Sequence, residues 1–136
     1  MSDNSLELQK AIVAAFRADT TIGALAGDRI YDLVPQPVTF PYVSFGPSQG
    51  EPYDGVNMDG WECIIELHTW SRSGANNRVE CQGIMAGIEA LLHDQDLTLD
   101  AAHFVTGRMQ SSRTFLDPDA ITVRGLQRFR FVTGTT

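Results

Sequence analysis

Two segments of the chain carry apolar residues at intervals of three and four, which is the period of an amphipathic helix. These segments are residues 5–18 and 77–93, and their apolar stripes consist of Leu8, Ile12, Ala15 and Phe16, and of Cys81, Ile84, Met85, Ile88 and Leu92. Asn4 and Glu7 have the spacing of a capping box, which predicts that the first helix starts at residue 5. Residues 20–26 predict a further short turn of helix that stops at Gly27.

The second predicted helix also carries a line of small residues beside its apolar stripe. These residues are Gly83, Ala86, Gly87 and Ala90. Glycine lowers helix stability, so such a line predicts that another element packs closely against it. The alanine-rich face of the first helix is the expected neighbour.

Residues 61–70 alternate between apolar and polar side chains, as a strand with one buried face does. Further strands are expected at residues 29–31, 42–46, 97–99, 103–116 and 121–132. The turn sequence Asp117-Pro118-Asp119-Ala120 joins the last two strands as a hairpin. Residues 47–60 combine glycines, prolines and acids, and they predict a long flexible loop.

This order of elements predicts one α+β domain over residues 1–136. The sheet is expected to be antiparallel or mixed, with two helices packed on one face. In the last strand, Ile121, Val123, Phe129 and Phe131 should face the helices, and three arginines should face away. Arg124, Arg128 and Arg130 then either pair with Glu62 and Glu66 of the same chain or contact another subunit or a nucleic acid.

The net charge of −7 disfavours a general nucleic-acid binder, because phosphate contacts need clustered bases. The charge is uneven: residues 103–136 contain five arginines and two acids, whereas the rest of the chain is strongly acidic. No apolar run reaches the roughly 20 residues of a membrane helix. The first residues lack the pattern of a signal peptide, so we expect the chain to remain in the cytoplasm where it is made.

Signals for catalysis and for metal binding are weak. Gly46-Pro47-Ser48-Gln49-Gly50 matches a nucleophile-elbow pattern, but the residues that follow cannot form the helix that an elbow requires. The three histidines lack metal-ligand spacing, and no nucleotide-binding motif occurs. We therefore expect no cofactor and no metal site, and we expect Cys63 and Cys81 to be buried free thiols.

Several phrases, taken in order, resemble the tail-completion or tail-terminator proteins of long-tailed phages and gene transfer agents. The phrases are Leu8–Phe16, Ile22–Tyr31 (IGALAGDRIY), Pro41–Phe45 (PYVSF), Leu67–Arg72 (LHTWSR), Ile88–His93 (IEALLH) and Thr122–Phe131 (TVRGLQRFRF). Together they cover nearly the whole chain, and residues 47–60 match the pattern least.

The resemblance implies a structural role in a virion or gene-transfer-agent particle, assembled in the bacterial cytoplasm. Such proteins form a ring, typically of six subunits, that ends the tail tube and joins it to the head-side connector. The ring leaves a channel through which DNA passes without specific binding. No cofactor, reaction or membrane is implied. Candidate contact residues to the next subunit or the tube are Glu51, Asp54, Asp59, Arg124, Arg128 and Arg130.

Two other functions are compatible with the residues. One is a small regulatory or immunity-type binding module that forms no ring. The other is a small hydrolase that uses Ser48 with a histidine. The mass of the assembly distinguishes the ring from the binding module, and activity of a Ser48→Ala variant tests the hydrolase.

Overall fold

The computed structural model describes residues 4–53, 59–72, 74, 77–99 and 103–135. Its elements, in chain order, are α1 (Ser5–Ala18), α2 (Thr20–Ala26), β1 (Ile30–Tyr31), β2 (Tyr42–Pro52), β3 (Asp59–Ser71), α3 (Asn77–Leu92), β4 (His103–Leu116) and β5 (Val123–Thr135). The strands form one sheet in the order β1-β2-β3-β5-β4. Only β1 and β2 are parallel, so the sheet is mixed and the predicted α+β class is confirmed.

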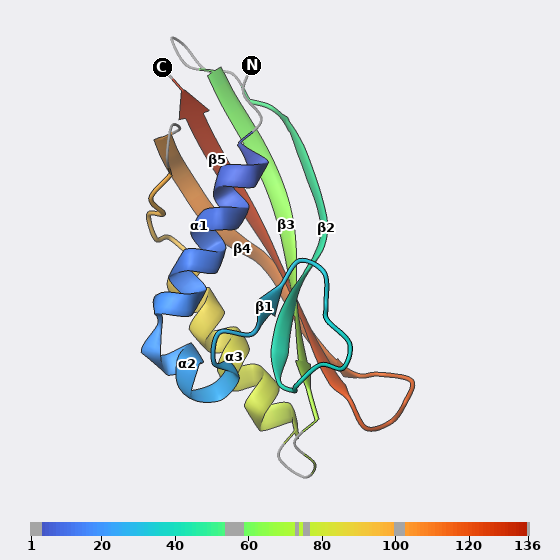
Figure 1. Ribbon diagram of the computed structural model, residues 1–136. Helices are drawn as coiled ribbons and strands as arrows, with labels where there is room; N and C mark the ends of the chain where they lie inside the picture. The colour runs from blue at the N-terminus through green and yellow to red at the C-terminus, as the bar shows by residue number, and fades with distance from the viewer. Residues whose placement is uncertain (1–3, 54–58, 73, 75–76, 100–102, 136) are drawn as a thin grey trace.

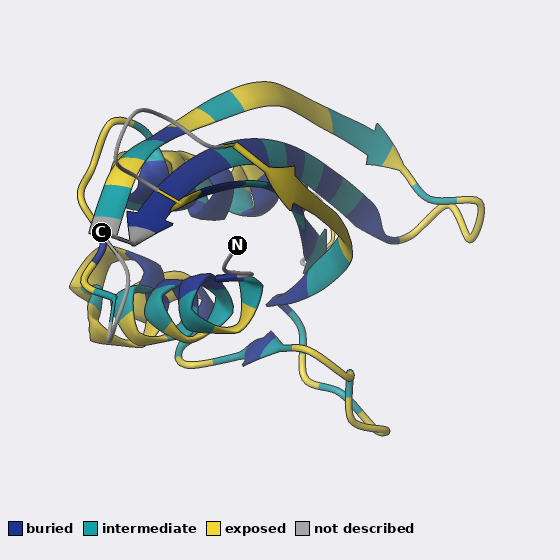
Figure 2. Ribbon diagram, turned by 90° about the horizontal axis from the view of Figure 1, so that it is seen from above, coloured by how far each residue is buried: buried dark blue, intermediate teal, exposed yellow. Residues whose placement is uncertain are grey.

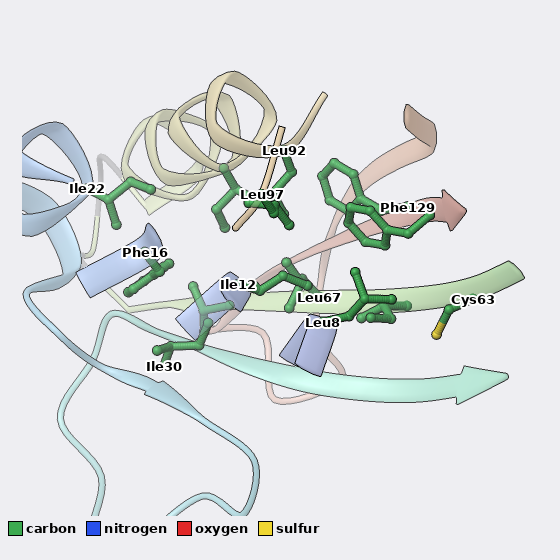
Figure 3. Packing of buried hydrophobic residues seen from close by; sticks show 14 of the residues in the cluster. Leu8, Ile12, Phe16, Ile22, Ile30, Cys63, Leu67, Leu92, Leu97 and Phe129 are labelled. Atoms are coloured by element: carbon green, nitrogen blue, oxygen red, sulfur yellow. The ribbon is translucent and has the colours of Figure 1, made fainter. Parts of the chain in front are cut away.

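The sheet is curved, and the helices lie on its concave side (Figures 1 and 2). The predicted alternation in β3 is confirmed, because Cys63, Ile65 and Leu67 are buried under the helices. Phe129 and Phe131 of β5 complete this layer. Figure 3 shows how the stripe of α1, with Leu8, Ile12 and Phe16, meets Leu67 and Phe129 in one core. None of the described helices lies on the opposite face of the sheet.

The start of α1 is held by the sheet and not by the predicted capping box. The Asn4 side chain makes no capping hydrogen bond to the helix. Its Nδ2 donates instead to Thr133 Oγ1 of β5 at 2.8 Å, and both residues are buried. The local sequence predicts that the Asn4 side chain caps the helix, but this side chain binds a residue of the sheet instead.

The predicted neighbour of the small-residue line on α3 is also corrected. A methyl group added at Gly87 would lie 2.7 Å from Ile22 Cγ1, and one at Gly83 would lie 3.4 Å from Leu25. Both contacts come from α2, the short helix that ends at Ala26. The glycines thus allow α2, and not the alanine-rich face of α1, to approach α3 at these positions.

The predicted long loop over residues 47–60 is wrong over much of its length. β2 continues to Pro52 and β3 begins at Asp59. The prolines are tolerated because β1 pairs only with Val43 and Ser44, so the rest of β2 is a free edge. A register shift between Phe45 and Ser48 accommodates Pro47.

Two smaller predictions fail near the ends of strands. Residues 97–99 form no strand; Leu97 enters the core from an irregular segment that follows a turn at Asp94, where φ is +55°. Ile121 is 59% exposed and not in the core. It belongs to the hairpin turn, where its N–H donates to Asp119 Oδ1 at 3.0 Å, and β5 starts only at Val123.

Both cysteines are buried thiols that form no disulfide, as predicted. Burial, with a smaller contribution from Glu80, raises the pKa of the Cys81 thiol to about 11. Among the described helices, none has the length and apolar character needed to cross a membrane.

Candidate subunit interface

The sheet face that no described helix covers carries charged side chains from four strands, β2, β3, β4 and β5. Alternation along β5 places Arg124, Arg128 and Arg130 on this face, as predicted, opposite Trp70, Glu66 and Ile64 of β3. We call it the open face. Its charged groups determine what the surface can bind.

Arg130 is paired within its own chain. Its Nε and Nη2 donate to Glu62 Oε2 at 3.0 and 2.7 Å. The guanidinium also lies 5.5 Å from the centre of the Tyr53 ring. Hydrogen bonding to Glu62 raises the pKa of Arg130 above its ordinary value, so the guanidinium stays charged. For this residue the intrachain interpretation is confirmed.

Arg124 is also occupied, by aromatic rings and a histidine. Its guanidinium lies 4.6 Å from the centre of the Trp70 ring and 5.6 Å from that of Phe115, within the range of cation–π attraction. Its Nη2 lies 2.9 Å from His68 Nδ1. His68 is buried, and its Nε2 lies 3.3 Å from Glu66 Oε1. Arg124 and Glu66 are thus bound to opposite sides of one imidazole.

Arg128 is the arginine of β5 that has no partner among the described residues. It lies opposite Glu66 in the strand register, but that carboxylate contacts His68. The Nε atoms of Arg124 and Arg128 are both buried without a hydrogen-bond partner among the described residues. Arg124 has its ring and histidine contacts, whereas the half-buried Arg128 makes no ion pair, ring contact or side-chain hydrogen bond with a described residue, so its charge can pair with an acceptor from another molecule.

Two further arginines, which the sequence analysis missed, join the open face from β4. Arg108 and Arg113 are five residues apart, a spacing that places side chains on opposite faces of a regular strand. A register shift between Met109 and Ser111 restores the phase, so Arg108 lies opposite Arg130 and Arg113 opposite Leu126. The sequence offered no local signal for this bulge.

The two acidic candidates that the structure describes, Glu51 and Asp59, lie on different strands. Glu51 is exposed on β2 and lies opposite Glu62, while Asp59 opens β3 and is exposed. Asp54 lies outside the described residues. The structure therefore does not gather these acids into one cluster with the three arginines; only Glu51 shares their face.

Ser48 does not come together with His68 or His93, the two histidines whose side chains the structure describes. Ser48 is part of β2 and pairs with Ile65, whose side chain faces the helices. His68 lies on the open face with Arg124. His93 Nδ1 accepts a hydrogen bond from the Met109 N–H at 3.0 Å. The elbow pattern thus lies in a strand, with neither histidine beside its serine.

Comparisons with known proteins agree with this fold. The family model described as tail completion protein gp17 matches residues 10–134. The chain belongs to the tail completion protein gp17 family. The tail completion protein gp17 of Bacillus phage SPP1 is 25% identical over 92 residues. That match covers 68% of this chain and 66% of the phage protein, slightly less than two thirds of its length.

A solved structure described as the virion of a native gene transfer agent particle contains a similar chain. The similarity has a TM-score of 0.87 at 23% identity and covers 98% of this chain and 99% of the other. At this identity it shows the fold. For a gp17 family member with this fold, the open face is the strongest candidate for a contact surface, because five arginines and three glutamates share it.

Proposed function

We propose that this chain is a structural protein of the virion tail that forms a ring, with six subunits, at the end of the tail tube. The observation that carries the proposal is the match of the tail completion family over residues 10–134. In this role the ring stops growth of the tube, contacts the tube protein on one side and the head-side connector on the other, and needs no reaction or cofactor.

The charge distribution supports ring formation through contacts between unlike surfaces. Closed rings are built when two different patches of one subunit meet on neighbouring copies. The open face is rich in arginine, while the chain as a whole has a net charge of −7. An acidic surface of the next subunit is therefore the natural partner of the open face, with Arg128 at the contact.

The same charges indicate how DNA passes. A surface of arginines would bind phosphate and release counterions, which slows a sliding strand. We therefore propose that the open face contacts another protein subunit and that an acidic surface of the chain forms the channel wall. Glu51, Asp54 and Asp59 remain candidates for contact with the tube or for this wall.

The mass of the assembly tests the proposal. The full chain is measured alone and with purified tail tubes, by light scattering and by averaged electron micrographs of tube ends. We expect a six-subunit ring at the tube end, and a free ring that weakens as salt rises because salt screens charge contacts. A monomer or a two-fold dimer at the tube end would contradict the ring and favour the binding module without a ring.

A further inference from the structure

A second polar surface lies on the helix side of the sheet, between α3 and the edge strand β4. It is a groove of about 340 Å³. Its lining consists of Gln82, Met85, Ala86 and Glu89 from α3, Ser112, Arg113 and Thr114 from β4, and Gln127 from β5. This volume is about ten times the 30 Å³ that one water molecule occupies in the liquid, so a side chain fits.

Gln127 is the unusual residue of this groove. It is 1% exposed, and its Nε2 donates to the Met85 carbonyl at 2.8 Å, which fixes the orientation of the amide. Its Oε1 is buried and has no hydrogen-bond partner among the described residues. A buried amide oxygen normally accepts a hydrogen bond, so Gln127 Oε1 lacks a donor. Gln127 is one of the residues that line the groove.

The other groups around the groove are mainly acceptors. Glu89 is exposed and makes no ion pair with a described residue. The Thr114 hydroxyl accepts only a long contact of 3.5 Å from Gln82 Nε2. The one cation of the lining, Arg113, lies on the open face with its guanidinium 5.3 Å from the centre of the Phe115 ring.

We infer that this groove binds an arginine side chain of a neighbouring copy of this chain. A guanidinium carries five donors and no acceptor, and its planar fork can reach a carboxylate and an amide oxygen together. Nine of the ten basic residues are arginine, and Arg17, Arg78 and Arg108 are exposed. The choice of a second copy rests on the proposed ring, in which one chain supplies both halves of each contact.

The site is tested first with a small probe, independently of any ring. N-acetyl-arginine amide is titrated into the chain while NMR follows the Gln127 side-chain amide, with the citrulline analogue as the uncharged control. We expect saturable shifts with the arginine probe only. Binding should weaken about tenfold in Gln127→Met, which removes the buried acceptor, and about two- to fivefold in Glu89→Gln, which removes an exposed charge.

Asp96→Asn is the matched control, because it removes an exposed acid outside the groove. Glu89→Gln lies on the helix surface and should fold normally, so the test remains valid if Gln127→Met unfolds. No saturable shift, equal binding of the citrulline probe, or unchanged binding in Glu89→Gln would overturn the site.

The second test concerns the neighbouring copy. Ring mass is compared for Glu89→Gln, for Arg17→Gln, Arg78→Gln and Arg108→Gln singly, and for each pair with Glu89→Gln. We expect one arginine whose effect disappears in the Glu89→Gln background. If rings form and no arginine couples to Glu89, the inference fails and the proposed function stands. If the probe binds but no ring forms, the proposed ring is wrong. The proposal that a neighbouring copy supplies the arginine is then wrong as well.

Discussion

Arg130 donates two hydrogen bonds to a single carboxylate oxygen of Glu62, from Nε at 3.0 Å and from Nη2 at 2.7 Å. Arg128, two residues away on the same face, has no such partner among the described residues, because Glu66 contacts His68. The two arginines look equivalent in the sequence, but one stabilises the subunit and the other is available to a second molecule.

This difference predicts opposite effects on subunit stability. Arg130→Gln should lower the free energy of unfolding by about 1 kcal/mol, because it breaks a partly buried charged pair. Arg128→Gln should change it by less than about 0.5 kcal/mol. Urea unfolding of the monomer at low concentration measures both. An equal loss in the two variants would contradict the assignment.

Assembly should show the reverse order of effects. Arg128→Gln should reduce ring formation or tail joining, because a charge desolvated between subunits couples more strongly than an exposed one. Lys10→Gln removes an exposed base on α1 and serves as the control for net charge. Ring mass and the yield of joined particles are the measurements. Full tail joining in Arg128→Gln would remove this residue from the interface.

Two helical glycines should respond to alanine with opposite signs. Gly87→Ala should cost about 1–3 kcal/mol, because the new methyl group would lie 2.7 Å from Ile22 Cγ1, close to the branch point of a packed side chain. Gly23→Ala should stabilise the chain by about 0.5 kcal/mol, because nothing lies within 4 Å and alanine favours a helix. Thermal unfolding of the two variants compares them directly, and stabilisation by Gly87→Ala would disprove the close approach of α2.

Asp119 should remain ionised to unusually low pH. Its pKa lies well below the ordinary 3.8, chiefly because Oδ2 accepts from the Thr122 hydroxyl at 2.6 Å and because the Ile121 and Thr122 N–H groups donate to Oδ1. Because the pKa is lower in the folded chain than in the unfolded one, the ionised carboxylate stabilises the folded hairpin at pH values above the unfolded pKa. This stabilisation is lost as the pH falls through the folded pKa. Carboxyl NMR should show the low midpoint.

Thr122→Val tests the cause of this shift. Valine keeps the branched shape of the side chain but cannot donate to Asp119. The midpoint of Asp119 should move up toward 3.8 in this variant. An unchanged midpoint would mean that the backbone N–H groups alone hold the carboxylate.

Cys81 should be almost inert in the folded chain. The thiol is buried, its pKa is raised to about 11, and it lies 3.8 Å from the Thr69 carbonyl. At pH 8 its reaction with iodoacetamide should be more than about a hundredfold slower than in urea, because so little thiolate exists. Peptide mapping by mass spectrometry separates Cys81 from Cys63, and similar rates in both states would show that the thiol is accessible.

The sequence alone determined the features that depend on local period. The stripe of Cys81, Ile84 and Ile88 recurs every three or four residues, and Cys63, Ile65 and Leu67 occupy alternate positions, so α3 and β3 were predictable from the hydrophobic effect and backbone geometry. The open placement of Arg124, Arg128 and Arg130 follows from the same alternation, because burying Phe129 and Phe131 excludes the opposite register.

Tertiary structure decided which neighbours these residues meet. The sequence could not show that Asn4 binds Thr133, because this contact joins the start of α1 to β5. Nor could it show that Glu66 contacts His68 of its own strand and not Arg128, which lies opposite Glu66 only because β3 pairs with β5. Likewise, one bulge in β4 brings Arg108 and Arg113 to the same face. Such bulges and partners are selected by the packing of the whole sheet, because local propensities differ too little to determine them.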